Sequence, residues 1–294
     1  IMNNILYISL LILPIISNSL SVSTLISTHT STISTLRSSI TSSNPNSNDY
    51  TDLFYLRHIL QFTPSSVEDN LKSTIQWREG KGKDIVTRAR DAVEMATKGG
   101  GKWDNEPVLS NAPHYDKIKS YITGREILTT STRGGDLVYC IRAGMIDDVG
   151  LMNAVTVEEM SDFFLYAKEV NTLVCDIRSS SSDRLCRVAL ANDLSGVSVF
   201  NSSPEFRKAL SVSSKIAAEI YPSVSRETLL LNLPKFLSAL VKIFKPIFPK
   251  TVQRKLKFVN GPLRGVEDLK DIAREGEERE KFLDQIEELM ETEF

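Results

Sequence analysis

The stretch TLLLNLPKFLSALVKIFKPIFPK, residues 228–250, predicts more about the fold than any other part of this chain. It begins with Thr228–Leu231, a short apolar run of the kind that forms a buried strand. The strand ends before Pro234, because proline has no N–H to donate to a sheet. Four apolar residues then recur at every fourth position and predict a helix with a broad apolar face: Phe236, Leu240, Phe244 and Phe248. Such a helix must lie against a protein core, a membrane or a lipid.

Predicted strands and helices alternate through the middle of the chain. The expected strands are 137–143, 185–191, 227–231 and 255–259, with a further extended segment at 127–132. The expected helices between them are 157–174 and 204–221, and residues 178–183 are expected to form a loop. This alternation is typical of an α/β fold whose helices cross over between the strands of a mainly parallel sheet. A small helical region is expected in front of it, with helices at 52–61, 66–79, 84–97 and 113–122.

Composition excludes several classes of protein. The net charge is −2 and 24% of residues are charged, so nothing points to a nucleic-acid partner. Three cysteines fit neither a zinc site nor a redox pair and are interpreted as buried thiols, and three well-separated histidines do not predict a metal site. No nucleophile elbow, metalloprotease motif or complete phosphate loop is present, so we do not expect an enzyme. Asp193, at a strand end, is the one candidate for catalysis, and a structural role is preferred for it.

Residues 1–48 have the composition of a targeting segment. They contain no Asp or Glu and a single basic residue, Arg37. An apolar run at 5–16 has the length of a signal-peptide core, and the Ser- and Thr-rich residues 19–48 are expected to stay disordered. The pair resembles the two-part presequence of algal plastid proteins, which predicts a plastid location. Secretion or an endomembrane lumen is an alternative, and the cytoplasm is another if residues 1–48 carry no targeting signal.

The C-terminal residues are acidic and predicted to be helical. A weak apolar stripe runs along them: Val266, Leu269, Ile272, Phe282, Ile286 and Leu289. We expect this helix to pack on the back of the sheet, although it could instead bind a protein partner through residues 266–294. The chain therefore divides into a presequence at 1–48, a helical region at 49–125, the α/β domain at 126–262 and an acidic helix at 263–294.

A series of short motifs resembles the CRAL-TRIO lipid-binding domain. Tyr221-Pro222 is followed by Asn232 and Pro234, eleven and thirteen residues past the tyrosine, and then by Lys245-Pro246. Further matches are Leu137–Tyr139, Asn192–Gly196, the Trp77-Arg78 pair, Phe236, and Thr251 ahead of the basic pair Arg254-Lys255. Together they span roughly residues 50–262, and their order and spacing make the set fairly specific although each motif alone is weak.

The resemblance implies a carrier with an enclosed apolar pocket, a sheet floor and a lid helix that opens at a membrane. A carrier must enclose its cargo, because each methylene left in water costs roughly 0.8 kcal/mol. No cofactor is expected besides the bound lipid, and the expected partner is a membrane surface, contacted transiently. The residues expected to contact the lipid are Tyr139, Tyr221, Leu231, Phe236, Leu240, Phe244, Phe248, Thr251, Arg254 and Lys255.

The identity of the lipid is less defined by the sequence. Family members that bind phosphatidylinositol have a Glu-Arg pair directly after the Tyr-Pro, where this chain has Ser223 and Val224. We therefore expect no phosphatidylinositol at the usual site, and another phospholipid or a prenyl-type lipid such as a tocopherol, quinone or carotenoid fits as well. Two alternatives to a carrier remain: a lipid-sensing adaptor whose pocket controls partner binding, and, less favoured, a hydrolase-type α/β enzyme.

Overall fold

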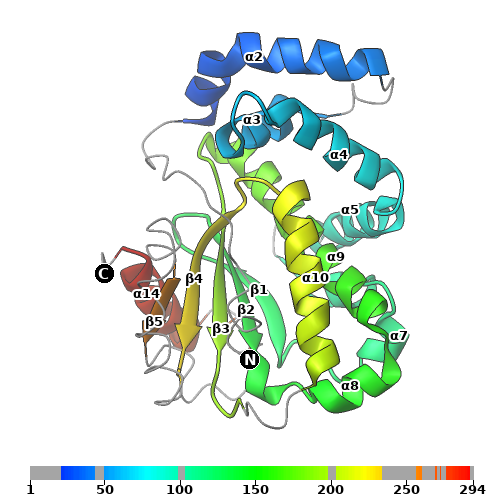
Figure 1. Cartoon of the computed structure of the whole chain (residues 1–294). Helices are drawn as coiled ribbons and strands as arrows, with labels where there is room; N and C mark the ends of the chain where they lie inside the picture. The colour runs from blue at the N-terminus through cyan, green and yellow to red at the C-terminus, as the bar shows by residue number, and fades with distance from the viewer. Residues whose placement is uncertain are drawn as a thin grey trace.

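Five strands form one sheet in which neighbours along the chain are neighbours in space (Figure 1). They are β1 (Ile127–Ser131), β2 (Leu137–Arg142), β3 (Val188–Asp193), β4 (Ser225–Leu231) and β5 (Leu256–Val259). β1 and β2 pair antiparallel, and the three remaining pairs are parallel. The predicted α/β fold with a mainly parallel sheet is confirmed, and the extended segment before β2 is its antiparallel edge.

The computed structural model describes residues 21–43, 50–98, 103–197, 203–233, 256–259, 269, 272 and 276–291. The expected lid helix at 236–248 lies outside these residues, as do the predicted lipid contacts Thr251, Arg254 and Lys255.

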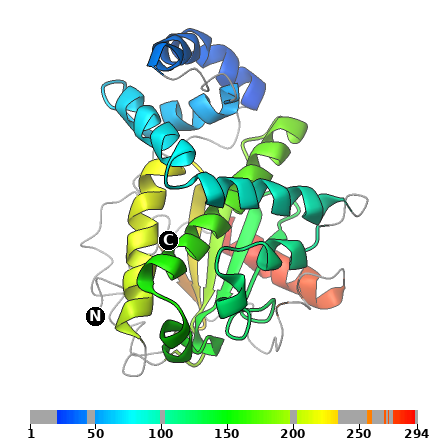
Figure 2. The same cartoon turned by 90° about the vertical axis from the view of Figure 1, so that its right-hand side faces the viewer.

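Helices cover one face of the sheet and form the parallel crossovers (Figure 2). They are α5 (Lys83–Thr97), α6 (Glu106–Ser110), α7 (Tyr115–Ile118), the short 3-10 turn η2 (Ala143–Met145), α8 (Asp148–Ala154), α9 (Val157–Ser182) and α10 (Pro204–Ile220). α9 starts at a capping box made by Thr156 and Glu159. α10 begins with Pro204 in its first turn, a position that suits proline.

The expected loop at 178–183 was wrong, because α9 continues through Ser182. Its serines are compatible with a helix since their hydroxyls donate to carbonyls one turn earlier: Ser179 to Cys175 at 2.6 Å and Ser182 to Arg178 at 2.7 Å. Asp183 then adopts a left-handed conformation and ends the helix.

The expected disorder of residues 19–48 was also wrong for the segment Val22–Ser43, which forms the helix α2. The buried residues of α2 recur on one face: Val22, Leu25, Ile33, Leu36 and Ile40. They pack against α3 (Asp52–Gln61) and α4 (Val67–Glu79). Several of the hydroxyls donate to carbonyls within the helix, as Thr28 does to the Thr24 carbonyl at 2.8 Å. Composition alone missed this helix because its apolar residues are few but all lie on the buried face.

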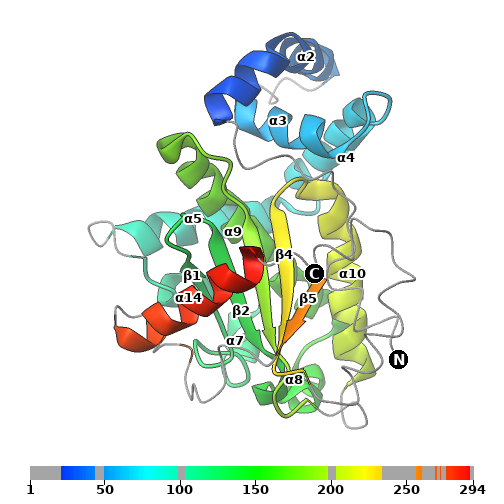
Figure 3. The ribbon, with the colours of Figure 1, turned by 90° about the vertical axis from the view of Figure 1, so that its left-hand side faces the viewer.

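The two faces of the sheet belong to two separate hydrophobic clusters. Leu137, Tyr139, Val188 and Leu190 point to the face covered by α9 and α10. Their neighbours along the strands point to the opposite face, where α14 (Glu277–Glu291) crosses the sheet (Figure 3). The residues of this second cluster are Leu128, Val138, Cys140, Ala189, Ala191, Leu229, Leu231, Leu269, Ile272, Phe282, Leu283, Ile286 and Met290. Small alanines at the centre of β3 let the helix approach the sheet closely.

Within the part of the chain that the structure describes, no helix is both long enough and apolar enough to cross a membrane.

Candidate functional site

Tyr139 provides an unpartnered hydroxyl inside the helix-covered face of the sheet. The tyrosine lies on β2 and is 8% exposed, and its hydroxyl has no hydrogen-bond partner among the described residues. Burial raises the pKa of this phenol well above its ordinary value, so the group is neutral and able to donate. A buried hydroxyl left without a partner costs about 1–3 kcal/mol, and its presence therefore needs an explanation.

Asn192 adds a second unpartnered donor on the same face. It lies on β3, where it pairs with Ile141, and Tyr139 pairs with Leu190 two residues earlier. Because side chains alternate along a strand, Tyr139 and Asn192 point the same way from adjacent strands. Asn192 is buried, and its amide nitrogen has no hydrogen-bond partner among the described residues. These two donors, on adjacent strands of the same face, are called the polar spot below.

The strand residues around this spot carry no charge. On the same face β3 contributes Val188 and Leu190, and β4 contributes Thr228, which pairs with Leu190. Towards the carboxyl ends of the strands the cluster continues with Leu194, Leu230, Leu233 and Leu256. A largely apolar surface with two donors on the same face is suited to a hydrophobic molecule that has an uncharged hydrogen-bond acceptor.

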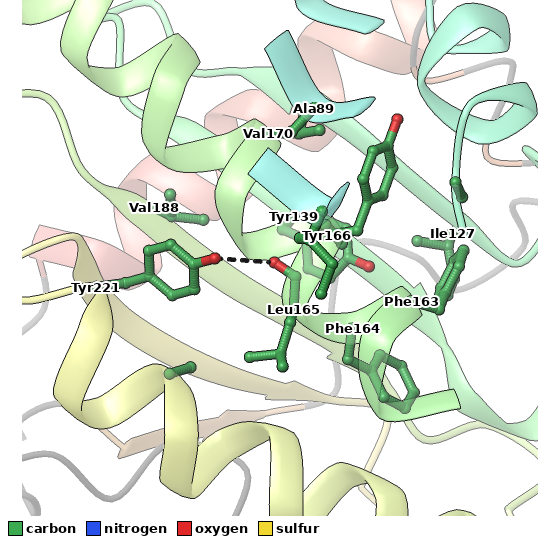
Figure 4. Packing of buried hydrophobic residues seen from close by; sticks show 14 of the residues in the cluster. Ala89, Ile127, Tyr139, Phe163, Phe164, Leu165, Tyr166, Val170, Val188 and Tyr221 are labelled. Carbon is green, nitrogen blue, oxygen red and sulfur yellow. Dashed lines mark hydrogen bonds between the residues drawn. The ribbon is translucent and has the colours of Figure 1, made fainter. Parts of the chain in front are cut away.

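Tyr221, in contrast, uses its hydroxyl inside the protein. It follows α10 and donates to the Leu165 carbonyl of α9 at 3.3 Å, as Figure 4 shows. Its ring meets Trp77 edge to face, at 6.3 Å between ring centroids. Burial raises the pKa of Tyr221 well above its usual value, and the negative charge of the nearby Glu169 adds to this effect. The structure thus gives Tyr221 a role in joining α10, α9 and α4.

Leu231 lies on the other face of the sheet from both tyrosines. It belongs to the cluster under α14 and is fully buried there. Tyr139 and Tyr221 belong to the cluster under α9 and α10. The structure therefore brings the two tyrosines into one cluster and separates them from Leu231.

Two buried arginines fix the N-terminal helices α3 and α4 to α9, and the sequence interpretation did not include their partners. Arg57 of α3 contacts Asp176 at 2.7 Å and donates to the Ser223 carbonyl at 2.9 Å. Arg78 of α4 donates to both oxygens of Glu169, at 2.7 and 2.6 Å. Periodicity along one helix cannot reveal such pairs, because their members are about 90 to 120 residues apart.

Residues 123–270 match the CRAL/TRIO domain. This match covers half of the chain. The chain belongs to the CRAL/TRIO family. Proteins of this family bind and transfer lipids, act at membranes and are generally not enzymes.

Among solved structures, the crystal structure of Sfh5 resembles this CRAL/TRIO protein with a TM-score of 0.45 and 16% sequence identity. The likeness covers 69% of this chain and 62% of the Sfh5 chain. No curated protein matches the sequence significantly.

In this CRAL/TRIO protein, the residues directly after Tyr221-Pro222 make contacts within the folded chain. Ser223 has a left-handed backbone and its carbonyl accepts from Arg57, while Val224 is buried in the main cluster. Arg226 and Glu227 lie three residues beyond the position of the family's Glu-Arg pair. Arg226 forms ion pairs with Asp136 and with Glu227. Asp136 also accepts from the Arg187 backbone, directly before β3, at 3.0 Å, so Arg226 is held at the amino end of the sheet.

Asp193 has a structural role in this CRAL/TRIO domain. One carboxylate oxygen accepts from the Ser195 backbone at 2.9 Å and from the Asn232 amide at 3.1 Å. The other lies 3.4 Å from the Arg142 guanidinium. These bonds join the ends of three strands and leave Asp193 2% exposed.

The described residues offer no metal site and contain three buried, free cysteines, as the sequence predicts for the thiols.

Proposed function

We propose that this protein binds one hydrophobic lipid against the helix-covered face of its sheet and transfers or presents it between membranes. The observation that supports this most directly is the pair of buried, unpartnered donors, Tyr139 and Asn192. A polar group of the cargo would satisfy both while its apolar part lies along Val188, Leu190 and Leu230. Family membership supports lipid binding in general terms, and the pocket itself is part of the proposal.

The lid remains a proposal from the sequence. In this proposal, the helix expected at residues 236–248 covers the cargo with its apolar face. The helix moves away when the protein meets a membrane. Thr251, Arg254 and Lys255 contact the polar end of the lipid or the membrane headgroups, at about 1 kcal/mol for each charge near an anionic surface. The contact with the membrane is peripheral and transient in this scheme, and the lipid is the only bound group it requires.

The cargo that fits best has an uncharged polar end. The strand positions around Tyr139 and Asn192 carry no charge, and Arg226 is engaged by Asp136. A prenyl-type lipid with a hydroxyl or carbonyl group suits these donors, whereas phosphatidylinositol lacks its usual Glu-Arg pair here. We therefore propose a neutral lipid of the tocopherol, quinone or carotenoid class.

Native mass spectrometry of the purified full chain, followed by solvent extraction, tests this proposal. We expect one neutral lipid per protein. Tyr139→Phe and Asn192→Leu should reduce its occupancy several-fold with little loss of thermal stability, because the Tyr139 hydroxyl and the Asn192 amide nitrogen have no hydrogen-bond partner among the described residues. Tyr221→Phe is the matched control: it should reduce stability, since it removes the bond to Leu165, and leave the polar spot intact. A stoichiometric phosphoinositide, or equal occupancy in all variants, contradicts the assignment.

A lipid-sensing adaptor is the second candidate, and the exposed acidic side of α14 favours it. Removing residues 266–294 is a poor test, because α14 covers the apolar back of the sheet. Charge reversal of the exposed Glu277 and Glu278, which pair with Lys281 of the same helix, leaves that packing in place. If the variant transfers lipid between vesicles as well as the wild type but no longer captures a cellular partner, the protein is an adaptor.

A further inference from the structure

Helix α2 has an amphipathic pattern of an uncommon kind. Fourteen of its 22 residues are Ser or Thr, and Arg37 is its single charged residue. Consecutive apolar residues are separated by one, three, four or seven positions. With 3.6 residues per turn, these separations place all of them within about a third of the helix circumference. These apolar residues are Val22, Leu25, Ile26, Ile33, Leu36 and Ile40. The opposite side is exposed, hydroxyl-bearing and uncharged.

We propose that α2 is a membrane-sensing helix. It detaches from α3 and α4 and inserts its apolar stripe into strongly curved lipid surfaces. An interfacial helix binds through its buried apolar area plus attraction of its charges to anionic lipid. The polar face of α2 supplies almost no charge, so insertion depends on the apolar stripe alone. Packing defects, which are most frequent in highly curved bilayers, provide the space that the stripe needs.

Polar contacts also hold α2, and they lie at its two ends. Near its C-terminal end, Ser39 donates to Glu68 of α4 at 2.5 Å and Arg37 donates to the Tyr50 carbonyl at 3.3 Å. The Asp183 carboxylate accepts from the backbone and hydroxyl of Ser23, at 2.7 and 2.8 Å. Arg37 pairs with Asp52 at 2.6 Å, with side chains 37% and 48% exposed. An exposed ion pair of this type contributes little to stability.

The main attachment of α2 is therefore its apolar stripe, and a membrane offers that stripe an equivalent environment. Leu36 and Ile40 pack on Tyr55 and Leu71 of α3 and α4 in the docked state. In a bilayer the same side chains would again be buried, among acyl chains. A helix of 22 residues, about 33 Å long, would lie flat at the headgroup boundary.

Flotation of the full chain with neutral phosphatidylcholine vesicles tests the proposal, because uncharged lipid excludes binding through the basic residues near 242–257. The wild type should bind small, highly curved vesicles several-fold better than large, flat ones. Leu36→Ser should abolish this difference. Ile26→Ser, at a half-buried edge of the stripe, should do the same while disturbing the docked fold less.

The decisive comparison uses two variants that both weaken docking of α2. Asp183→Gly removes the bonds to Ser23 while keeping the left-handed backbone, which glycine adopts freely. It should increase binding to curved vesicles several-fold, opposite to Leu36→Ser, because it releases an intact stripe. Ser31→Ala, on the exposed side, is the control and should change nothing.

Equal binding of the wild type to flat and curved vesicles overturns the proposal. So does binding that survives Leu36→Ser and Ile26→Ser, because the apolar run at residues 5–16 is present in every variant and would then be responsible. A failure of Asp183→Gly to increase binding contradicts release of α2 as the controlling step. None of these outcomes depends on which lipid, if any, the sheet carries.

Discussion

Arg57 and Arg78 show how single side chains hold the two helical layers together. Each is buried, and each is paired with a carboxylate on α9, Asp176 or Glu169. Arg78 also lies over the Tyr50 and Phe54 rings, at 5.9 and 6.0 Å from their centroids. Glu169 is completely buried, so its charge depends on Arg78 for compensation.

We predict that Arg78→Leu lowers the free energy of unfolding by about 3–5 kcal/mol, because it leaves Glu169 charged and buried without a partner. Urea denaturation followed by circular dichroism measures this. The double variant Arg78→Leu with Glu169→Leu should recover most of the loss. A double variant as unstable as the single one would mean that packing, and not the uncompensated charge, dominates.

His58 should make the protein less stable in mild acid. It is fully buried between the Phe54 carbonyl at 2.9 Å and Thr74, and burial lowers its pKa to about 4. Its pKa in the unfolded chain is about 6.5, so between pH 6.5 and 4 the unfolded state binds the extra proton. Stability should fall by up to about 3 kcal/mol as the pH drops through this window.

Denaturation curves at pH 7 and pH 4.5 check this, with His58→Gln as the control. The variant should be less stable at pH 7 but should lose less on acidification. If both proteins lose the same amount, the carboxylates account for the pH dependence and His58 does not.

At the scale of elements, α14 is fastened to the back of the sheet at both ends. Arg133, in the turn before β2, contacts Glu280, Asp284 and Glu287 along its first three turns. Lys257 of β5 donates to the Leu289 and Met290 carbonyls at its end, at 2.6 and 2.7 Å. A cation at the end of a helix satisfies unpaired carbonyls and complements the helix dipole.

We predict that Lys257→Met destabilises α14 by about 1–3 kcal/mol, because the chain length is kept while the two carbonyls lose their donor. Hydrogen exchange should become faster at the C-terminal end of α14 and stay unchanged in α9. Arg133→Gln should have a smaller effect, because its ion pairs are exposed and contribute about 0–1 kcal/mol each. Equal protection in wild type and Lys257→Met would contradict this role.

At the scale of the molecule, α2 belongs to the folded body. It covers Leu53, Tyr55 and Leu56 of α3 and meets the end of α9 at Asp183. Delivery to a plastid through residues 1–48, proposed from composition, must therefore be reconciled with a helix that the fold uses.

We predict that any processed form keeps α2 and begins at or before Ser21. A chain lacking residues 1–20 keeps α2 and is the reference for a longer truncation. A chain lacking residues 1–48 should unfold several degrees lower or aggregate, because apolar side chains of α3 and α4 become exposed. N-terminal sequencing of the protein isolated from its cells, and thermal unfolding of both truncated chains, check this; a native start within 22–43 contradicts it.

The sequence by itself determined the α/β class, the order of strands and helices, and the boundaries of elements such as α3 and α10, whose apolar spacing and terminal residues are local signals. It also carried the motifs of the CRAL/TRIO family. Tertiary structure decided that α2 is folded, because six apolar residues among fourteen hydroxyl-bearing ones become a stable face only when α3 and α4 are there to receive it. It likewise decided that Leu231 faces α14 while Tyr139 and Asn192 share the other side, since strand pairing and register, which depend on residues about fifty positions apart, set which side chains meet.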